Sequence, residues 1–384
     1  MVKGEFPLDL FRDRRTPFYF YDTALLRQTI EEVKRQIADR PTWQVHYAVK
    51  ANANPELLQI IARYGLGADC VSGGEVSAAL AAGFKPESVV FAGVGKRDDE
   101  IQLGLDAGIG RFNVESTAEM EVINQLALAA GRRAPISIRV NPDVGAHTHA
   151  NITTGLAENK FGIHHSILPE TIARAQKLPG LDFRGIHFHI GSQILDMSDF
   201  VALCNRINEC TLRLNQLGIK LQDINVGGGL GIDYEHPNHL PIADFRAYFD
   251  VFKRHLDCKC PVHFEPGRSI VAPCGSLISR VLYVKDGLHK QFAILDASMT
   301  ELLRPALYHA YHRIENISSD GPAEKYDVVG PVCESSDVFG KGVLLDKCSR
   351  GDFIAIRSAG AYGESMASRY NCRPLPDSIC FDGK

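Results

Sequence analysis

Eight short apolar runs alternate with amphipathic helical stretches over the first two thirds of the 384-residue chain. Short apolar runs of this kind are typical of buried parallel strands. Strand and helix alternating eight times, with no strand-only segment between them, predict a (β/α)₈ TIM barrel at about residues 24–269. The expected strands lie within QVHYAVKA, LGADCVS, VVFAG, RFNVES, ISIRVNP, FRGIHFHIGS, QDINVGG and VHFEPGR.

The helical patterns nearly stop after Arg268. The remaining chain reads as short strands, such as GSLISRVLYVKDG and DFIAIRSAG, separated by Gly, Asp and Pro turns. The early segment TPFYFYD is also strand-like, but it precedes the first barrel strand. The sequence therefore predicts a C-terminal all-β domain, a barrel or sandwich, that comprises residues 1–23 and 270–384 and includes this N-terminal strand.

Charge and hydropathy narrow the classes of partner. The net charge is -4 and no basic run occurs, which argues against nucleic acid or an anionic membrane surface. No apolar run reaches the roughly 18 residues of a membrane span, and MVKGEFPLDLFRDRRTPF lacks the apolar core of a signal peptide. We therefore expect a cytoplasmic protein that acts on a small molecule.

The ten cysteines are scattered along the chain. The one close pair, Cys258-x-Cys260, lacks the second Cys or His pair that a zinc site needs, so no metal is expected. In a cytoplasmic chain most of them should be buried thiols.

Candidate functional residues come from the carboxyl ends of the barrel strands, where the active site of such a barrel lies. These ends carry Lys50, Asp69, His189, Gly227-Gly228-Gly229 and Glu265-Pro266-Gly267-Arg268. Lys50 closes the apolar run Tyr47-Ala48-Val49, and burying an ammonium group without a partner is costly. Some feature of the site must compensate for this charge.

One of these motifs could bind an anion, and another could face a ring nitrogen. The three glycines of NVGGGLG leave no side chain between backbone N–H groups and a phosphate, although such a triplet can also be a flexible turn. In HFEPGR, Glu265 ends an apolar strand three residues before Arg268. This carboxylate either caps the strand in an ion pair or faces a ring nitrogen and keeps it protonated.

The histidines of GIHFHIGS lie on one face of their strand, because side chains alternate between the faces. A lone histidine in a strand is more often a core residue, and no third metal ligand accompanies this pair. His189, next to Gly191 and Ser192 at the strand end, is better placed for a ligand than His187.

A lysine, a phosphate cradle, a carboxylate for a ring nitrogen and an imidazole that can stack on a flat ring together describe a site for pyridoxal 5'-phosphate (PLP). Burial of Lys50 is then explained, because the lysine forms a Schiff base with the cofactor aldehyde.

With these motifs in order, the chain resembles the fold-type III PLP enzymes, and among them the diaminopimelate decarboxylases. The resemblance runs from about residue 15 to residue 375. It is carried by HYAVKAN, GADCVSGGE, NKFGI, HIGSQ, NVGGGLG, EPGR, LLRPALY, GPVCESSDVFG and GAYGESMASRYN. It implies the decarboxylation of meso-2,6-diaminopimelate to L-lysine, the last step of lysine biosynthesis.

The resemblance also implies roles for individual residues. Lys50 would bind the cofactor covalently, His189 would stack on its ring, and Glu265 would pair with its pyridine nitrogen. The phosphate would be held by Ser192, the backbone of Gly228 and Gly229, Gly267 and Tyr362. The cofactor-binding set also includes Asp69 and Arg268.

A homodimer with shared active sites is implied as well. The CES segment would come from the other subunit, with Cys333 as the proton donor and Glu334 bound to the amino group at the D-centre of the substrate. The substrate carboxylates would be bound by Arg268, Arg304, Tyr308 and Tyr362. Alternatively, Cys333 is one more buried thiol and Arg304 part of a surface ion pair.

Two departures from the family pattern stand out. Ser298 in DASMTELLRP occupies a position where we expect glycine, which bears on local backbone shape. The chain also ends about ten residues after NCRP, so the last strand of the β domain is expected to be trimmed or replaced.

Other functions fit the motifs less well. A decarboxylase of ornithine, lysine or carboxynorspermidine would not need Arg304, Tyr308 and Glu334 together, because its substrate lacks the distal amino-carboxylate pair. An alanine racemase lacks the CES signature. A non-catalytic PLP-binding homologue should have lost Lys50 or Cys333, and both are present.

Overall fold

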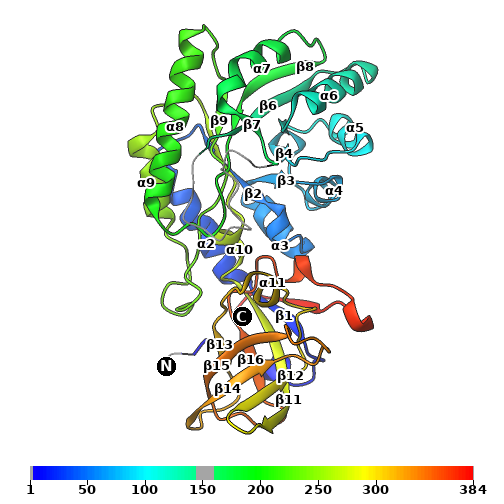
Figure 1. Ribbon diagram of the computed structural model, residues 1–384, viewed down its shortest axis with the longest axis vertical. Coiled ribbons are helices and arrows are strands. Elements are labelled where there is room, and N and C mark those ends of the chain that lie inside the picture. The colour runs from blue at the N-terminus through cyan, green and yellow to red at the C-terminus, as the bar shows by residue number, and fades with distance from the viewer. Residues whose placement is uncertain (1–2, 144–159, 384) are drawn as a thin grey trace. The chain divides into compact units, whose positions relative to one another are not determined.

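In the computed structural model of the chain, residues 3–143 and 160–383 are described (Figure 1). They divide into two compact units. One unit comprises residues 30–231 and 244–268, and the other comprises residues up to 29, 232–243 and 269–384. Helix α2 (Thr23–Gln36) contains the first of these boundaries.

The first unit is a closed barrel of eight parallel strands. Hydrogen bonds connect the strands in the order β5-β4-β3-β2-β10-β9-β8-β6, and pairing of β5 with β6 closes the sheet. The strands are β2 (Trp43–Ala48), β3 (Gly67–Cys70), β4 (Val89–Phe91), β5 (Arg111–Val114), β6 (Ala134–Asn141), β8 (Leu181–His187), β9 (Asp223–Asn225) and β10 (Val262–Phe264). Each of the eight predicted runs overlaps one of them, so the predicted barrel is confirmed. A short β7 (Ile163–His164) extends the sheet beside β6.

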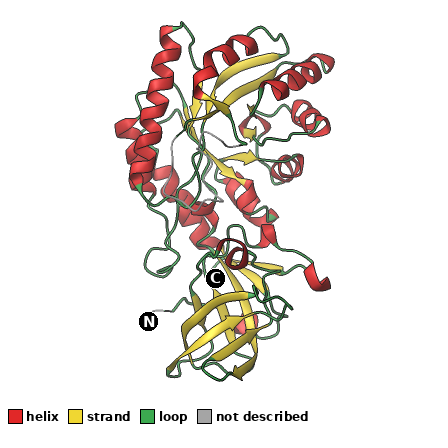
Figure 2. Cartoon of the chain, in the orientation of Figure 1, coloured by secondary structure: helices red, strands yellow, loops and turns green. Residues whose placement is uncertain are grey.

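Helices follow the strands and lie outside them, as Figure 2 shows. They are α3 (Pro55–Arg63), α4 (Gly73–Ala81), α5 (Asp98–Ala107), α6 (Thr117–Ala129), α7 (Leu168–Ala175), α8 (Met197–Gln216) and α9 (Phe245–His255). Five begin at a residue whose side chain accepts a hydrogen bond from the first helical turn, which fixes where the helix starts. These residues are Asn54, Ser72, Ser116, Asp196 and Asp244.

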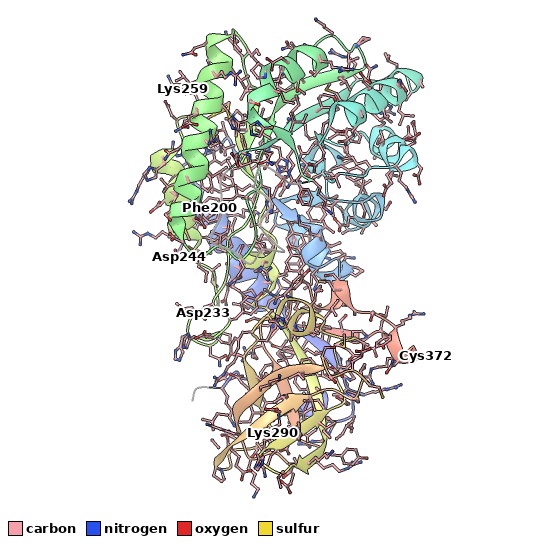
Figure 3. All side chains as sticks on the ribbon, in the orientation of Figure 1. Phe200, Asp233, Asp244, Lys259, Lys290 and Cys372 are labelled. Atoms are coloured by element: carbon pink, nitrogen blue, oxygen red, sulfur yellow. A yellow bond between two sulfur atoms is a disulfide. The ribbon has the colours of Figure 1, made fainter. Side chains whose placement is uncertain are left out.

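Aromatic packing joins α8 to α9. Phe200 of α8 is fully buried, and its ring centroid lies 4.9 Å from that of Tyr248 in α9, edge to face (Figure 3). Such pairs stabilise a fold beyond the area that they bury. Among the helices that the structure describes, none is both long and apolar enough to cross a membrane.

The barrel interior also contains paired polar side chains. Arg111, the first residue of β5, donates to both carboxylate oxygens of Asp223, the first residue of β9, at 2.9 and 2.6 Å. The imidazoles of His46 and His263 meet at 2.8 Å between Nε2 and Nδ1. Burial lowers the pKa of both histidines, so they are neutral at pH 7. Each of these buried groups thus has the partner that burial requires.

The second unit is built on a β-sheet. Its strand order is β13-β16-β11-β12-β14-β15, with β1 paired to both β11 and β17. The strands are β1 (Phe18–Asp22), β11 (Gly275–Asp286), β12 (Gln291–Leu295), β13 (Ile314–Asn316), β14 (Ala323–Val329), β15 (Val338–Asp346), β16 (Phe353–Ile356) and β17 (Asp377–Phe381). The short helices are α1 (Leu8–Phe11), α10 (Arg268–Val271) and α11 (Arg304–Tyr308). The all-β domain and its N-terminal strand are therefore as predicted.

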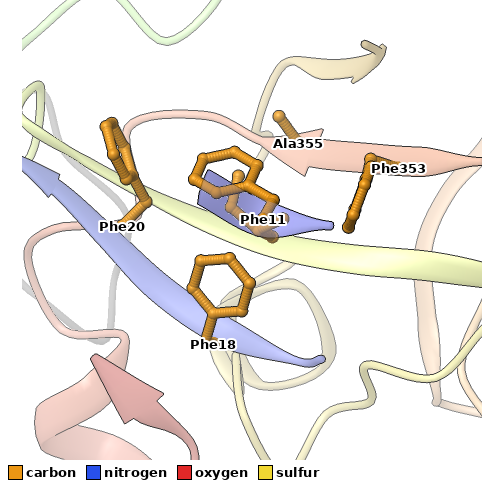
Figure 4. Close-up of a cluster of buried hydrophobic side chains, with 6 residues drawn as sticks. Phe11, Phe18, Phe20, Phe353 and Ala355 are labelled. Carbon is orange, nitrogen blue, oxygen red and sulfur yellow. The ribbon is translucent and has the colours of Figure 1, made fainter. Parts of the chain in front are cut away.

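A cluster of aromatic side chains fills part of this unit (Figure 4). The ring of Phe11 lies edge to face with those of Phe18, Phe20 and Phe353, at centroid distances of 5.2, 5.3 and 5.9 Å. Because Phe18 and Phe20 belong to β1 and Phe353 to β16, the cluster attaches the N-terminal strand to the C-terminal half of the chain.

The two departures from the family pattern have structural answers. Ser298 is buried, its φ is not positive, and its backbone N–H donates to the Glu301 carboxylate at 2.7 Å. The serine thus fits without a conformation that only glycine favours. The residues after NCRP form β17, which runs parallel to β1, so the chain still ends in a paired strand.

The cysteines differ from the expectation in part. Five are buried thiols: Cys70, Cys204, Cys210, Cys274 and Cys348. Cys333 and Cys372 are exposed, Cys380 is half-buried, and Cys258 is joined to Cys260 in a disulfide.

Candidate active site

Lys50 lies directly after the first barrel strand. Strand β2 ends at Ala48, and Lys50 is the middle residue of a single 3₁₀ turn, Val49–Ala51. The Tyr47 hydroxyl donates to the backbone oxygen of buried Asn52 at 2.8 Å, which fixes the turn. The lysine is half-buried and is held at the carboxyl end of its strand, where the sequence placed it.

Asp69, in the neighbouring strand β3, is an acidic group with spare hydrogen-bonding capacity. It is 2% exposed, and within the described part of the chain its Oδ1 atom has no hydrogen-bond partner. Burial and the charge of Glu265 raise its pKa well above the usual value, although Lys50 opposes this. Because buried polar atoms normally have a hydrogen-bond partner, this oxygen is suited to bind a ligand.

Glu265, directly after β10, is a buried acidic group of the site with several hydrogen-bond partners. Its Oε1 atom accepts hydrogen bonds from Nδ2 of Asn225 at 2.6 Å and of Asn113 at 3.5 Å, and its Oε2 atom lies 2.9 Å from Nε2 of His187. Burial alone would raise the pKa of this carboxyl, but the contact with His187 and the nearby charge of Lys50 bring it below its usual range. Glu265 is therefore ionised.

These contacts correct one alternative from the sequence. The guanidinium of Arg268 donates to Ser192 Oγ, at 3.3 Å from Nε and 3.0 Å from Nη2, whereas Glu265 contacts the side chains described above. The carboxylate is therefore not the capping ion pair that the spacing in HFEPGR allowed. His187, which the sequence placed below His189 as a ligand-binding candidate, contacts the Glu265 carboxylate.

His189 has the properties of a neutral ring. Its Nδ1 atom accepts a hydrogen bond from the backbone N–H of Gly228 at 3.3 Å. Desolvation, Lys50 and Arg139 lower its pKa well below the usual value. An uncharged imidazole at a strand end is suited to stacking on a flat ring.

The glycine segment packs too closely for side chains. A Cβ atom on Gly228 would lie 2.1 Å from the backbone oxygen of Glu265, and Gly227 and Gly229 have φ values of 75° and 112°. A hydrogen bond of 2.9 Å from Ile194 N–H to Gly229 O holds the segment beside the loop that carries Ser192. These glycines, with the serine hydroxyl and the Arg268 guanidinium, form a cradle with the donor chemistry that a phosphate requires.

The remaining predicted residues belong to the second unit. Arg304 is buried, its Nη1 atom lies 2.7 Å from Nε2 of His312, and its guanidinium lies over the Tyr234 ring at 5.0 Å. Tyr308 is the last residue of α11, and Tyr362 has a φ of 57°. Arg304 is therefore not part of a surface ion pair.

The CES segment is exposed. Cys333 and Glu334 are both on the surface, and the Tyr370 hydroxyl donates to Glu334 Oε1 at 2.6 Å. Cys333 is thus not one more buried thiol. The sequence analysis did not identify Tyr370, Asn225 or Asn113, although the two asparagines are polar residues near strand ends, a signal that could have identified them.

As a set, the barrel residues fit PLP. A half-buried lysine, an ionised carboxylate, a neutral imidazole, an unsatisfied buried oxygen and a phosphate cradle converge on the carboxyl ends of the strands. No group of three or more His, Cys, Asp or Glu side chains among residues 3–143 and 160–383 is arranged to hold a metal ion.

Comparison with known proteins agrees with this chemistry. Residues 24–272 match the family described as pyridoxal-dependent decarboxylase, pyridoxal binding domain. The diaminopimelate decarboxylase of Bacteroides thetaiotaomicron is 60% identical over 383 residues, 99% of both chains. That of Vibrio cholerae is 43% identical over 98% of this chain and 89% of its own.

Solved structures show the same similarity. The crystal structure of Helicobacter pylori diaminopimelate decarboxylase complexed with L-lysine superposes with a TM-score of 0.92 at 42% identity, covering 98% of this chain and 94% of that one. The crystal structure of diaminopimelate decarboxylase from m. jannaschii in co-complex with L-lysine superposes with a TM-score of 0.92 at 34% identity, covering 100% of this chain and 91% of that one.

Proposed function

The chain belongs to the diaminopimelate decarboxylase family of pyridoxal-dependent enzymes, and on this basis we propose which residues bind the cofactor, bind the substrate and transfer the proton. It is a PLP-dependent decarboxylase that converts meso-2,6-diaminopimelate to L-lysine. The predicted activity, enzyme class and cofactor are thereby confirmed. The observation that best supports the assignment of the site is the buried, ionised Glu265 among three hydrogen-bond donors.

PLP, when bound, supplies a ring that accepts the electron pair released as the substrate carboxylate leaves. In our proposal Lys50 binds the cofactor aldehyde, and Asp69 lies near this lysine as a further cofactor-binding group. Glu265 would accept a hydrogen bond from the N–H of the ring nitrogen, and His189 would cover the ring. Ionised Glu265 stabilises the protonated nitrogen because an opposite charge nearby favours the charged form.

The phosphate is assigned to a second group of residues. It would accept hydrogen bonds from the glycine backbone and from hydroxyl groups, with Arg268 as the neighbouring positive charge. The residues are Ser192, Gly228, Gly229, Gly267, Arg268 and Tyr362.

Substrate recognition is assigned to both ends of the amino acid. Arg268, Arg304, Tyr308 and Tyr362 would bind its carboxylates, since a guanidinium matches a carboxylate in a bidentate way. Glu334 would bind the ammonium group at the D-centre. Cys333 would donate its thiol proton to the carbon that has lost carbon dioxide, as a general acid.

We further propose that the enzyme is a homodimer in which Cys333 and Glu334 act in the site of the partner subunit. The exposure of both residues supports this assignment, because a surface segment is accessible to a second copy. A cytoplasmic location is proposed because eight of the ten cysteines are free thiols, as is usual in a reducing compartment.

A panel of amino acids tests the substrate assignment. The purified enzyme with PLP should release carbon dioxide and L-lysine from meso-2,6-diaminopimelate. For L-lysine, L-ornithine and carboxynorspermidine, kcat/KM should be lower by about 100-fold or more, since each leaves a polar group of the site unpaired. Comparable turnover of ornithine would reject the assigned substrate while leaving the cofactor site intact.

A further inference from the structure

We propose that His187 is a positioning residue for Glu265. Its Nε2–H group holds the carboxylate ionised and correctly oriented, so that the proton shared with the cofactor ring stays on the ring nitrogen. The inference deepens the proposed function and depends on the role proposed there for Glu265.

The geometry assigns each oxygen of Glu265 its own donors. Asn225 and Asn113 both donate to Oε1, at 2.6 and 3.5 Å. His187 is the hydrogen-bond partner of Oε2, at 2.9 Å, and the side chains of His187 and Glu265 are 2% and 4% exposed. Removal of the imidazole would thus leave Oε2 without a protein donor among the described residues. Water cannot easily replace a donor at such a depth.

The tautomer of His187 follows from its second ring nitrogen. Nδ1 is buried and has no hydrogen-bond partner in the described part of the chain. A proton on Nδ1 would have no acceptor there. The proton on the other ring nitrogen, Nε2, points to Oε2 of Glu265, which is ionised and can only accept.

The consequence concerns the position of one proton. A carboxylate that receives hydrogen bonds on both oxygens binds a proton weakly, because those bonds favour its charged form. Without the donor on Oε2, Glu265 becomes a stronger base and competes with the ring nitrogen for the shared proton. The nitrogen then loses positive charge and withdraws electrons less well.

His46 provides a matched control. It is also a histidine of a barrel strand and is likewise 2% exposed. Its ring nitrogens bond instead to Ser88 O at 3.0 Å and to His263 at 2.8 Å. Substitution of His46 therefore removes a buried imidazole from the barrel without removing a donor from Glu265.

The experiment measures directly whether the ring nitrogen of the cofactor is protonated. Holoenzyme is prepared with PLP that carries ¹⁵N in the ring, and the ¹⁵N chemical shift is measured for wild type and for H187L, H187Q, H46L and E265Q. Thermal unfolding of each apoprotein verifies folding. Gln can present an N–H close to the position of Nε2, whereas Leu keeps the bulk and removes the donor.

In wild type and H46L the shift should be that of a protonated ring nitrogen. In H187L it should move toward the unprotonated value, with kcat lower by about ten- to a hundredfold and KM changed far less. H187Q should restore the wild-type shift and most of the rate.

A protonated ring in folded H187L, with E265Q unprotonated, would overturn the role of His187 and keep that of Glu265. A protonated ring in E265Q would instead reject the proposed role of Glu265 itself.

Discussion

Lys50→Ala should abolish decarboxylation and remove the visible absorbance of the bound cofactor. The reason lies in the positions of the amines at the barrel end. Lys96 also follows a barrel strand, but its ammonium group donates to Gly93 O, Asn113 O and Glu119 Oε1, at 2.9, 2.8 and 2.6 Å. All three donors of that lysine are therefore committed, and it cannot replace Lys50.

Absorbance spectra and lysine production of the purified variant test this expectation. Lys259, an exposed lysine between α9 and β10 (Figure 3), is the matched control. Lys259→Ala should keep both the absorbance and the activity, because that side chain lies at the amino end of its strand. An unchanged cofactor band in Lys50→Ala would show that another lysine binds the aldehyde.

Cys333→Ala should lose nearly all activity but keep the absorbance of the cofactor, since Lys50 and the phosphate cradle are unchanged. Cys372, the other exposed free cysteine, gives the control, and Cys372→Ala should remain active. Activity and absorbance measured on the same preparations separate loss of the proton donor from loss of the cofactor.

The shared site predicts recovery on mixing. Lys50→Ala and Cys333→Ala homodimers, dissociated and reassociated together, form heterodimers in which one site has both defects and the other has none. Random exchange makes about half the dimers mixed, each with one intact site, so roughly a quarter of wild-type activity should return. No recovery, with subunit exchange verified by mass, would show that Lys50 and Cys333 act within one chain.

The barrel was predictable because its signals are local. Each apolar run is largely buried, and five of the following helices begin at a polar residue that caps them, as with Ser72 and Ser116. The order of strands around the barrel then follows from chain order. Local signals did not predict the pairing at the end of the chain, because β17 pairs with β1 across more than 350 residues.

The position of a candidate residue was predictable where it is defined by its place on a strand. The places of Lys50, His189 and Glu265 just after β2, β8 and β10 agree with the strand ends expected from the sequence. Their partners were not predictable in this way, because contacts such as His187 with Glu265 or Tyr370 with Glu334 join separate segments. Alternation placed His187 and His189 on one face, but it could not say which acidic side chain from a neighbouring strand would meet the first of them.

Covalent attachment of PLP to Lys50 can be measured directly. Sodium borohydride reduction of the holoenzyme fixes the cofactor on the lysine that binds it, and peptide mass spectrometry then locates the added phosphopyridoxyl mass. We predict this mass on the peptide that contains Lys50 in wild type, and on no peptide of Lys50→Ala. The same mass on Lys96 or any other lysine of the wild-type protein, with Lys50 unmodified, would contradict the assignment of this site.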